Sequence, residues 1–289
     1  MLHRESVTEP RVGRTADVEV VELDGAKRKR IHDEIVGEEP LELRLTAGGA
    51  TRTLAVTMRT PGNDFELAAG FVYSEAIVRA RDEIAGLSYC IDPSVDSDQR
   101  YNIVNVELRP SARVPDLARF ERHFTMSSSC GVCGRAQLDS LRSLGALPIE
   151  DDVRFSARVL YALPDRMHDA QRVFAATGGL HAAALFDERG DAIAVREDVG
   201  RHNALDKLIG WALLEARLPL RRSMLMVSGR AGYEILQKAV MAGAPIVASV
   251  SAPSSLAVEL AREFNVTLAG FVRGDRANLY AAPERIVAP

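Results

Sequence analysis

The chain has 289 residues, of which 47% are hydrophobic and 26% charged, and its formal net charge is −4 at pH 7. This composition can form the buried core of one large domain or of two closely packed ones. The negative charge argues against a nucleic-acid partner, and no apolar run reaches the ~18 residues of a membrane span. The N-terminus lacks the apolar core of a signal peptide, so we expect a cytoplasmic protein that binds neither nucleic acid nor membrane.

The first expected elements are an unstructured tail and a hairpin. Residues 1–38 are charged, poor in aromatic side chains and without clear periodicity, which predicts a mobile tail that becomes a strand near its end. Apolar and polar side chains alternate over 41–46 and again over 53–58. Two such runs separated by a glycine-containing turn predict a β-hairpin.

A helix and two strands are expected next. Asn63 and Glu66 have the spacing of a capping box, and apolar residues recur at helical intervals up to Ile77, which predicts a helix. Strands are expected over 87–90 and 101–106. Cys90 ends the first of these strands, and we interpret it as a small structural side chain.

The second half alternates between strands and helices. Strands are expected over 182–187, 192–196, 224–227, 246–250 and 267–272, and helices over 203–216, 233–241 and 255–263. This order, with nearly continuous apolar strands, predicts a mostly parallel sheet covered by helices. The expected fold class is α/β, or α+β for the whole chain. We expect a tail over 1–38, a strand-rich part over 39–150 and an α/β part over 151–289.

Two of the three cysteines lie close together, in the segment Cys130-Gly131-Val132-Cys133. A cysteine reacts as its thiolate, which requires access and nearby positive potential. The small residues around the pair leave the sulfur uncovered, and a helix expected from Arg135 would favour a negative sulfur at its N-terminus. Cys130 is therefore the candidate for a reactive sulfur.

Other roles for this pair stay open. Half of a structural zinc site would need further ligands, and beyond the pair the chain offers only Cys90 and six scattered histidines. A reversible disulfide is a second alternative, although the pair does not follow a first strand as in thioredoxin-type proteins. The zinc deaminase pattern fails, because Ser129 stands where that pattern has a proline.

Four polar loops follow expected strands of the second half, and three of them contain both arginine and glycine. These loops span 196–203, 228–232, 251–255 and 273–276. In open α/β sheets ligands bind beyond the carboxyl ends of the strands, where glycine lets the backbone approach a phosphate and arginine binds it. We predict a phosphate-bearing ligand, with ordinary loop composition as the alternative because no complete dinucleotide or Walker motif is present. His181 and His202 are interpreted as polar loop residues, and no metal site is expected.

Five separate segments of the sequence recur in the same order in one known family. They are 60–71 (TPGNDFELAAGF), 130–134 (CGVCG), 178–183 (GGLHAA), 197–207 (EDVGRHNALDK) and 228–230 (SGR). With these segments the chain resembles the FdhD/NarQ family of formate dehydrogenase accessory proteins, from about residue 40 to the C-terminus. The resemblance implies a sulfurtransferase, or sulfur carrier, that takes persulfide sulfur from a cysteine desulfurase. Its acceptor would be the molybdenum cofactor of formate dehydrogenase, Mo-bis(molybdopterin guanine dinucleotide).

The resemblance also implies roles for individual residues. Cys130 would bear the persulfide, and Cys133 would be its essential companion. The cofactor would bind the segment Phe271-Val272-Arg273-Gly274-Asp275-Arg276, in which the two arginines suit phosphates.

The family further implies an α/β part similar to the cytidine deaminases, and homodimers. Two alternatives remain. The chain could be a cofactor chaperone whose cysteines bind metal without carrying sulfur, or a dithiol oxidoreductase.

Overall fold

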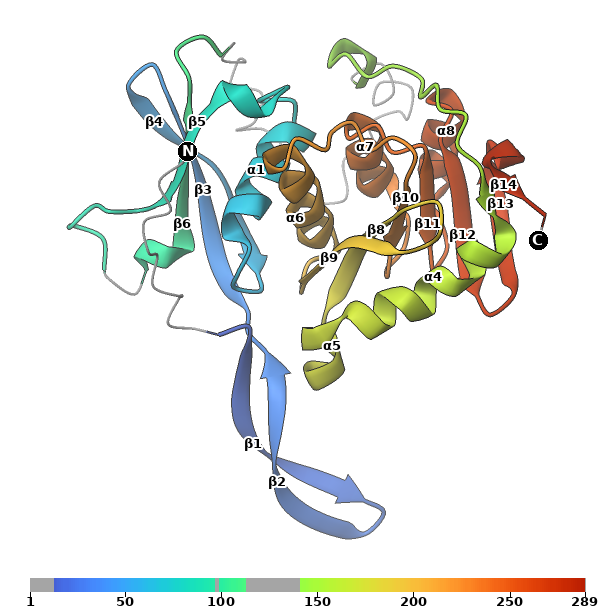
Figure 1. The fold of residues 1–289 in the computed structure, drawn as a ribbon. Coiled ribbons are helices and arrows are strands. Elements are labelled where there is room, and N and C mark those ends of the chain that lie inside the picture. Colours follow the sequence, from blue (N-terminus) through green and yellow to red (C-terminus); the bar gives the residue numbers. More distant parts are fainter. Residues whose placement is uncertain (1–12, 97–98, 113–140, 289) are drawn as a thin grey trace.

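Two larger sheets and a projecting two-stranded arm make up the computed structural model, which describes residues 13–96, 99–112 and 141–288 (Figure 1). The N-terminal sheet has four strands and the C-terminal sheet has six. A short parallel pair consists of β7 (Phe155–Ser156) and β14 (Ile286–Val287). The chain is a mixed α/β protein, which confirms the predicted fold class.

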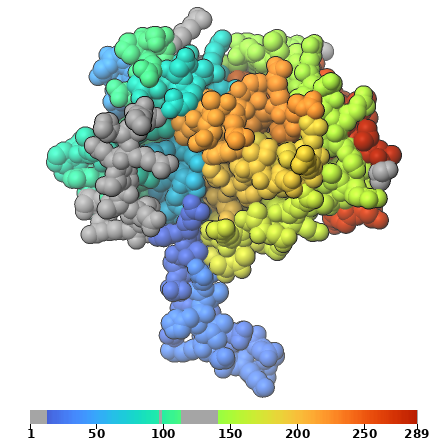
Figure 2. Space-filling model, viewed as in Figure 1, coloured from blue at the N-terminus to red at the C-terminus, as the bar shows by residue number. Residues whose placement is uncertain are grey.

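The N-terminal arm replaces most of the predicted tail. β1 (Thr15–Asp24) and β2 (Lys27–Val36) form an antiparallel ribbon that projects from the rest of the molecule (Figures 1 and 2). Acidic residues of β1 lie opposite basic residues of β2, as in Glu22–Lys29 and Asp24–Lys27, and such pairs stabilise a ladder. The prediction of a mobile tail was wrong for residues 15–36. Polar and apolar residues alternate over 17–20 and 21–24, but most side chains of the arm are exposed, and its charged composition favoured a tail. Residues 1–12 lie outside the described part.

The N-terminal sheet confirms the predicted hairpin. Its order is β4-β3-β6-β5, in which β3 spans Glu39–Ala47, β4 Ala50–Arg59, β5 Ile84–Tyr89 and β6 Ile103–Leu108. Leu41, Leu43 and Leu45 alternate along β3 and are buried in one cluster with the apolar residues of α1 (Asp64–Ser74). The alternation seen in the sequence therefore marks the face that packs on this helix.

The start of α1 differs from the predicted capping box. Asn63 precedes the helix with φ 59° and makes no side-chain cap; its carboxamide oxygen accepts a hydrogen bond from Arg14 over 2.7 Å. The Glu66 carboxylate instead binds the Arg196 guanidinium, with 2.7 Å between Nη2 and Oε1. A contact with a residue 130 positions away along the chain displaces the local cap. The helix also ends at Ser74, before the predicted Ile77.

The C-terminal sheet is mixed rather than mostly parallel. Its order is β13-β12-β11-β10-β8-β9, with β8 at His181–Phe186, β9 at Ala192–Asp198, β10 at Met224–Val227, β11 at Ile246–Ser249, β12 at Thr267–Arg273 and β13 at Arg276–Ala281. Only β10, β11 and β12 run parallel to one another. The other pairs are antiparallel. Short hairpins return β9 beside β8 and β13 beside β12, and such turns join only antiparallel strands.

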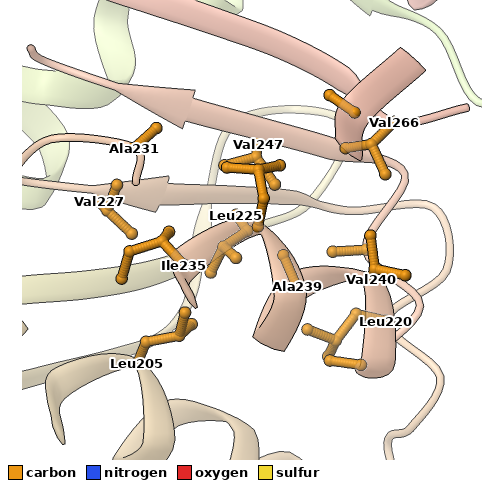
Figure 3. Packing of buried hydrophobic residues seen from close by; sticks show 14 of the residues in the cluster. Leu205, Leu220, Leu225, Val227, Ala231, Ile235, Ala239, Val240, Val247 and Val266 are labelled. Carbon is orange, nitrogen blue, oxygen red and sulfur yellow. The ribbon is translucent and has the colours of Figure 1, made fainter. Parts of the chain in front are cut away.

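Helices cover both faces of this sheet (Figure 1). α6 (Arg201–Leu214), α7 (Tyr233–Met241) and α8 (Ser255–Glu263) pack on the face that buries Leu225 and Val247 (Figure 3). α4 (Ala157–Ala170) packs on the opposite face and is followed by α5 (Arg172–Thr177). The sequence prediction lacks α4, which contains Pro164, a residue that usually breaks helices. No helix in the described ranges has the length and apolarity needed to cross a membrane.

Helices α1 and α6 join the two sheets, and they lie side by side (Figure 1). Their backbones touch at two glycines. A Cβ on Gly70 would lie 1.8 Å from the Asp206 carbonyl oxygen, and one on Gly210 would lie 1.8 Å from the Glu66 carbonyl oxygen. These glycines permit an approach that no larger residue allows. The domain boundary near residue 150 stays a prediction.

Candidate functional site

The carboxyl ends of β10, β11 and β12 meet at one edge of the C-terminal sheet. Ala231, after β10, forms an isolated parallel bridge with Pro253, after β11. The N–H group of Phe271 in β12 donates to the carbonyl oxygen of Ser251 over 3.1 Å. The loops 228–232 and 251–255 therefore converge with the end of β12, as the sequence predicts. The ligand that they would bind remains a prediction.

The predicted cofactor segment, 271–276, spans the end of β12 and its turn into β13. Phe271 is 37% exposed and has φ 53°, in the left-handed region that disfavours bulky residues. Val272 is fully buried in the core, so its side chain is not available to a ligand. Arg273 and Arg276 are exposed beside the hairpin turn, where a phosphate could reach them.

His181 and Arg201 lie at the same edge. A Cβ on Gly229 would be 3.4 Å from the His181 ring and 3.7 Å from Cδ of Arg201, which places all three together. The Ser228 hydroxyl oxygen accepts a hydrogen bond from the N–H of Ala182 over 2.8 Å and lies 3.5 Å from Nδ1 of His181. The predicted loop 228–232 thus meets the start of β8. The strand itself was predicted, but this contact was not.

The start of α6 is linked to the start of α7. Nε2 of His202 lies 3.2 Å from Oε2 of Glu234. Neither Gly200 nor Gly232, which precede the two helices, provides a side-chain cap. Among the described residues no side chain therefore caps either helix start, where the helix dipole favours an anion.

The electrostatics of this edge suit a negatively charged ligand. Nε of Arg201 is buried and makes no hydrogen bond within the described part of the chain. A buried donor without an acceptor is costly, so an anion beside Arg201 would supply a missing partner. Burial lowers the pKa of both His181 and His202, which favours their neutral forms at pH 7.

We expect the pKa of His181 to lie below the ordinary histidine value, about 6.5. Burial disfavours the charged imidazole, and the Arg201 guanidinium lowers the pKa further. Arg201→Met should keep the burial and raise the pKa of His181. NMR titration of the ring signals measures both values.

The same shift has a stability consequence. The pKa of His181 is lower in the folded protein than in the unfolded chain. Its contribution to the free energy of unfolding is therefore complete above about pH 6.5, and it is lost as the pH falls toward the folded-state pKa. A pKa of His181 at or above the ordinary value, or one that Arg201→Met leaves unchanged, would contradict this picture.

Several charged residues of the 197–207 segment are structural. Asp198 and Lys207 form a buried ion pair, with 2.7 Å between Oδ2 and Nζ. The Asp198 carboxylate accepts the N–H of Thr60 over 3.2 Å, and Lys207 donates to the Thr60 carbonyl oxygen over 2.8 Å. This network attaches α6 to the segment just before α1, so neither charge faces the site.

Two further acids of this segment also serve the fold. Asp206 binds Lys238 of α7 with two contacts of 2.9 Å and accepts the Ser74 hydroxyl over 2.9 Å. Glu197 accepts the N–H of Phe174, at the start of α5, over 2.8 Å. Partners so distant in sequence cannot be recognised from spacing.

The structure describes one of the three cysteines, Cys90. Cys130 and Cys133, together with the helix expected from Arg135, lie outside the described residues. Cys90 directly follows β5 and is 6% exposed, which confirms that it is buried. Within the described ranges no group of three or more His, Cys, Asp or Glu side chains could hold a metal ion.

Sequence reasoning missed His181 as a member of the strand-end site. The interpretation of His181 as a loop residue was wrong, because it is the first residue of β8, whereas the predicted site contains only residues at the ends of strands. Because β8 runs antiparallel to β10, its first residue lies at the edge where β10 ends. Only the strand direction reveals this, and the sequence contains no signal for it.

The fold and this edge define a mixed α/β protein with an arginine-containing site beyond its parallel strands. A family model described as the FdhD/NarQ family matches residues 36–287. The chain belongs to this family, which confirms the resemblance.

Individual relatives cover most of the chain. It is 53% identical over 265 residues to the sulfur carrier protein FdhD of Streptomyces coelicolor, covering 91% of this chain and 92% of the relative. The sulfur carrier protein FdhD of Mycobacterium tuberculosis is 49% identical, with 86% and 90% covered. A crystal structure from Desulfotalea psychrophila, provisionally assigned as a formate dehydrogenase accessory protein, has a TM-score of 0.72 at 22% identity and covers 94% of this chain and 99% of its own. At that identity the likeness supports the fold alone.

Proposed function

We propose that this chain is a sulfur carrier that serves formate dehydrogenase. The observation that carries the proposal is family membership over residues 36–287, together with relatives of about half identity that are named sulfur carrier proteins. The enzymatic step is a sulfurtransferase reaction, with a cysteine desulfurase as donor. Mo-bis(molybdopterin guanine dinucleotide) is the substrate that receives the sulfur.

Cys130 is the sulfur acceptor in this proposal. Its thiolate attacks the terminal sulfur of the desulfurase persulfide, a new S–S bond forms, and the donor S–S bond breaks to release the desulfurase thiolate. One S–S bond forms and one breaks, so the sulfur atom is transferred without net oxidation. Cys133 assists by holding the sulfur in transit or by resolving the spent carrier.

The strand-end site would hold the cofactor as a bound substrate. Two features support binding of its phosphates. The buried Nε of Arg201 has no hydrogen-bond partner among the described residues, and none of their side chains caps the starts of α6 and α7. Arg273 and Arg276 would bind further phosphate oxygens from the hairpin. The backbone at Gly229 and the neutral His181 would position the ligand between them.

Partners and location follow from the same proposal. The protein would contact a cysteine desulfurase and formate dehydrogenase in turn, act in the cytoplasm, and form homodimers. The main alternative is a cofactor chaperone whose CxxC pair binds metal and carries no sulfur.

Incubation with a cysteine desulfurase and cysteine should add one sulfur atom to the wild-type chain, and a thiol reductant should remove it. Cys130→Ala should abolish this gain, because the accepting thiolate is lost. Intact-mass spectrometry measures the sulfur bound to each variant.

Cys90→Ala provides the matched control. That side chain is buried, so its removal should leave sulfur loading unchanged. If no variant gains sulfur but the wild type binds guanosine diphosphate, which represents the phosphate-bearing end of the cofactor, the chaperone alternative replaces the carrier.

A further inference from the structure

The hydroxyl group of Ser228 is held in a fixed place at the strand-end site. Ser228 directly follows β10, and its backbone N–H donates to the carbonyl oxygen of Ala182 over 3.0 Å. Its hydroxyl oxygen accepts the N–H of the same residue over 2.8 Å. The side chain thus takes the place of a backbone carbonyl in the ladder between β8 and β10. These two bonds hold the hydroxyl beside the ring of His181, the first residue of β8.

The hydroxyl hydrogen of Ser228 sets the direction of its contact with His181. The oxygen lies 3.5 Å from Nδ1 of the ring, and no other described residue offers this hydrogen an acceptor within hydrogen-bond distance. A neutral imidazole carries its proton on one nitrogen and accepts at the other, so a ring that accepts at Nδ1 has its proton on Nε2. The separation is long for such a bond, and contacts of this kind shorten when a site binds its ligand.

We propose that Ser228 is a positioning residue, which holds His181 with its proton on Nε2 so that this N–H donates to a phosphate oxygen bound beside Arg201. The inference rests on the proposed function, from which it takes the phosphate-bearing substrate. Among the described residues Ser228 is the one hydrogen-bond partner of the ring. The Nε2 donor is therefore available to the ligand.

Gly229 leaves the space between the two donors open. A Cβ there would lie 3.4 Å from Nδ1 and Cε1 of His181 and 3.7 Å from Cδ of Arg201. These are ordinary contact distances, so the packing of the protein does not require glycine at this position, whereas a ligand that approaches the backbone does. The buried Nε of Arg201, which has no acceptor among the described residues, is the second donor for an oxygen in this space.

A neutral donor suits this place better than a second cation. Burial lowers the pKa of His181, and the Arg201 guanidinium lowers it further, because protonation would place two cations side by side. Asp198 lies opposite His181 in the ladder with β9 and acts in the other direction, but its carboxylate is paired with Lys207 over 2.7 Å. His181 therefore contributes a directed hydrogen bond rather than a charge.

Nitrogen NMR of the full-length protein measures the tautomer, because protonated and unprotonated ring nitrogens give distinct signals. At about pH 8, where the ring is neutral, wild-type His181 should carry its proton on Nε2. Ser228→Ala removes the bond to the neutral ring, so it should admit the Nδ1–H form and raise the pKa of His181. Ser228→Thr keeps the hydroxyl group and should restore the wild-type tautomer and pKa.

Titration calorimetry with inorganic pyrophosphate measures the effect on binding. Ser228→Ala should weaken binding about fivefold to tenfold, and Ser228→Thr should stay within about twofold of the wild type, because a hydrogen bond to a charged oxygen depends on how its donor is held. His181→Ala should weaken binding more than His181→Gln, whose amide keeps an N–H donor.

Three results would overturn this inference: a proton on Nδ1 in the wild type, a pKa of His181 that Ser228→Ala leaves unchanged, or a pyrophosphate affinity that does not depend on Ser228. The gain of sulfur at Cys130 is measured separately. Its failure would remove the carrier function and leave the tautomer and affinity results standing.

Discussion

Gly210→Ala is expected to lower the free energy of unfolding by about 3 kcal/mol. Helix propensity alone would predict the opposite sign, because alanine favours a helix over glycine by up to ~1 kcal/mol. Here the new Cβ would lie 1.8 Å from the Glu66 carbonyl oxygen and 2.6 Å from the backbone nitrogen of Gly70. Backbone atoms cannot rotate away, so α1 and α6 must separate and lose packing. Urea unfolding followed by circular dichroism measures the change.

Gly232→Ala is the matched control for this substitution. Gly232 has φ −84°, and a Cβ built there meets no atom within 4 Å. Its replacement should change stability by no more than about 0.5 kcal/mol. Equal effects of the two substitutions would show that the contact between α1 and α6 is not as close as described.

Lys207→Met should destabilise the protein by about 3–5 kcal/mol, because it leaves the buried Asp198 carboxylate without its cation. Lys207 is 1% exposed and Asp198 is 0% exposed, so water cannot replace the lost partner. Methionine retains most of the packing of the lysine methylene groups, so the loss of stability can be attributed to the missing charge. Chemical denaturation provides the measurement.

An exposed ion pair supplies the comparison. Nη2 of Arg222 lies 2.6 Å from the Glu188 carboxylate, and both side chains are well exposed. Arg222→Met should cost at most about 1 kcal/mol. If Lys207→Met cost no more than this, the buried network would not hold α6 to the Thr60 segment.

Much of the C-terminal half could be predicted because local and tertiary preferences agree there. The strand over 224–227 and the helices over 233–241 and 255–263 match the prediction to the residue. The strand is buried on both faces, so its continuous apolar run is unambiguous. The sequence also predicted that the strand-end loops converge, because the carboxyl ends of parallel strands lie at one edge of the sheet.

The remaining features depend on contacts that are remote in sequence. Glu66 was assigned to a local cap, yet it binds Arg196 on β9. Asp198 and Lys207 were placed in a strand-end loop and the helix after it, but their contacts with Thr60 make them part of the core. The arm lacks a buried face, so the high charge of its sequence outweighed the short polar/apolar alternation over 17–20.

The close contact between α1 and α6 limits where the chain could be divided into separate polypeptides. α6 follows residue 150, yet Lys207 binds Thr60, Asp206 binds Ser74 and Gly210 touches α1. A polypeptide beginning at residue 151 would present these buried groups to water. The two halves therefore are not interchangeable modules: recombination near residue 150 would require compatible surfaces on both sides, and changes in one half would have to be matched in the other.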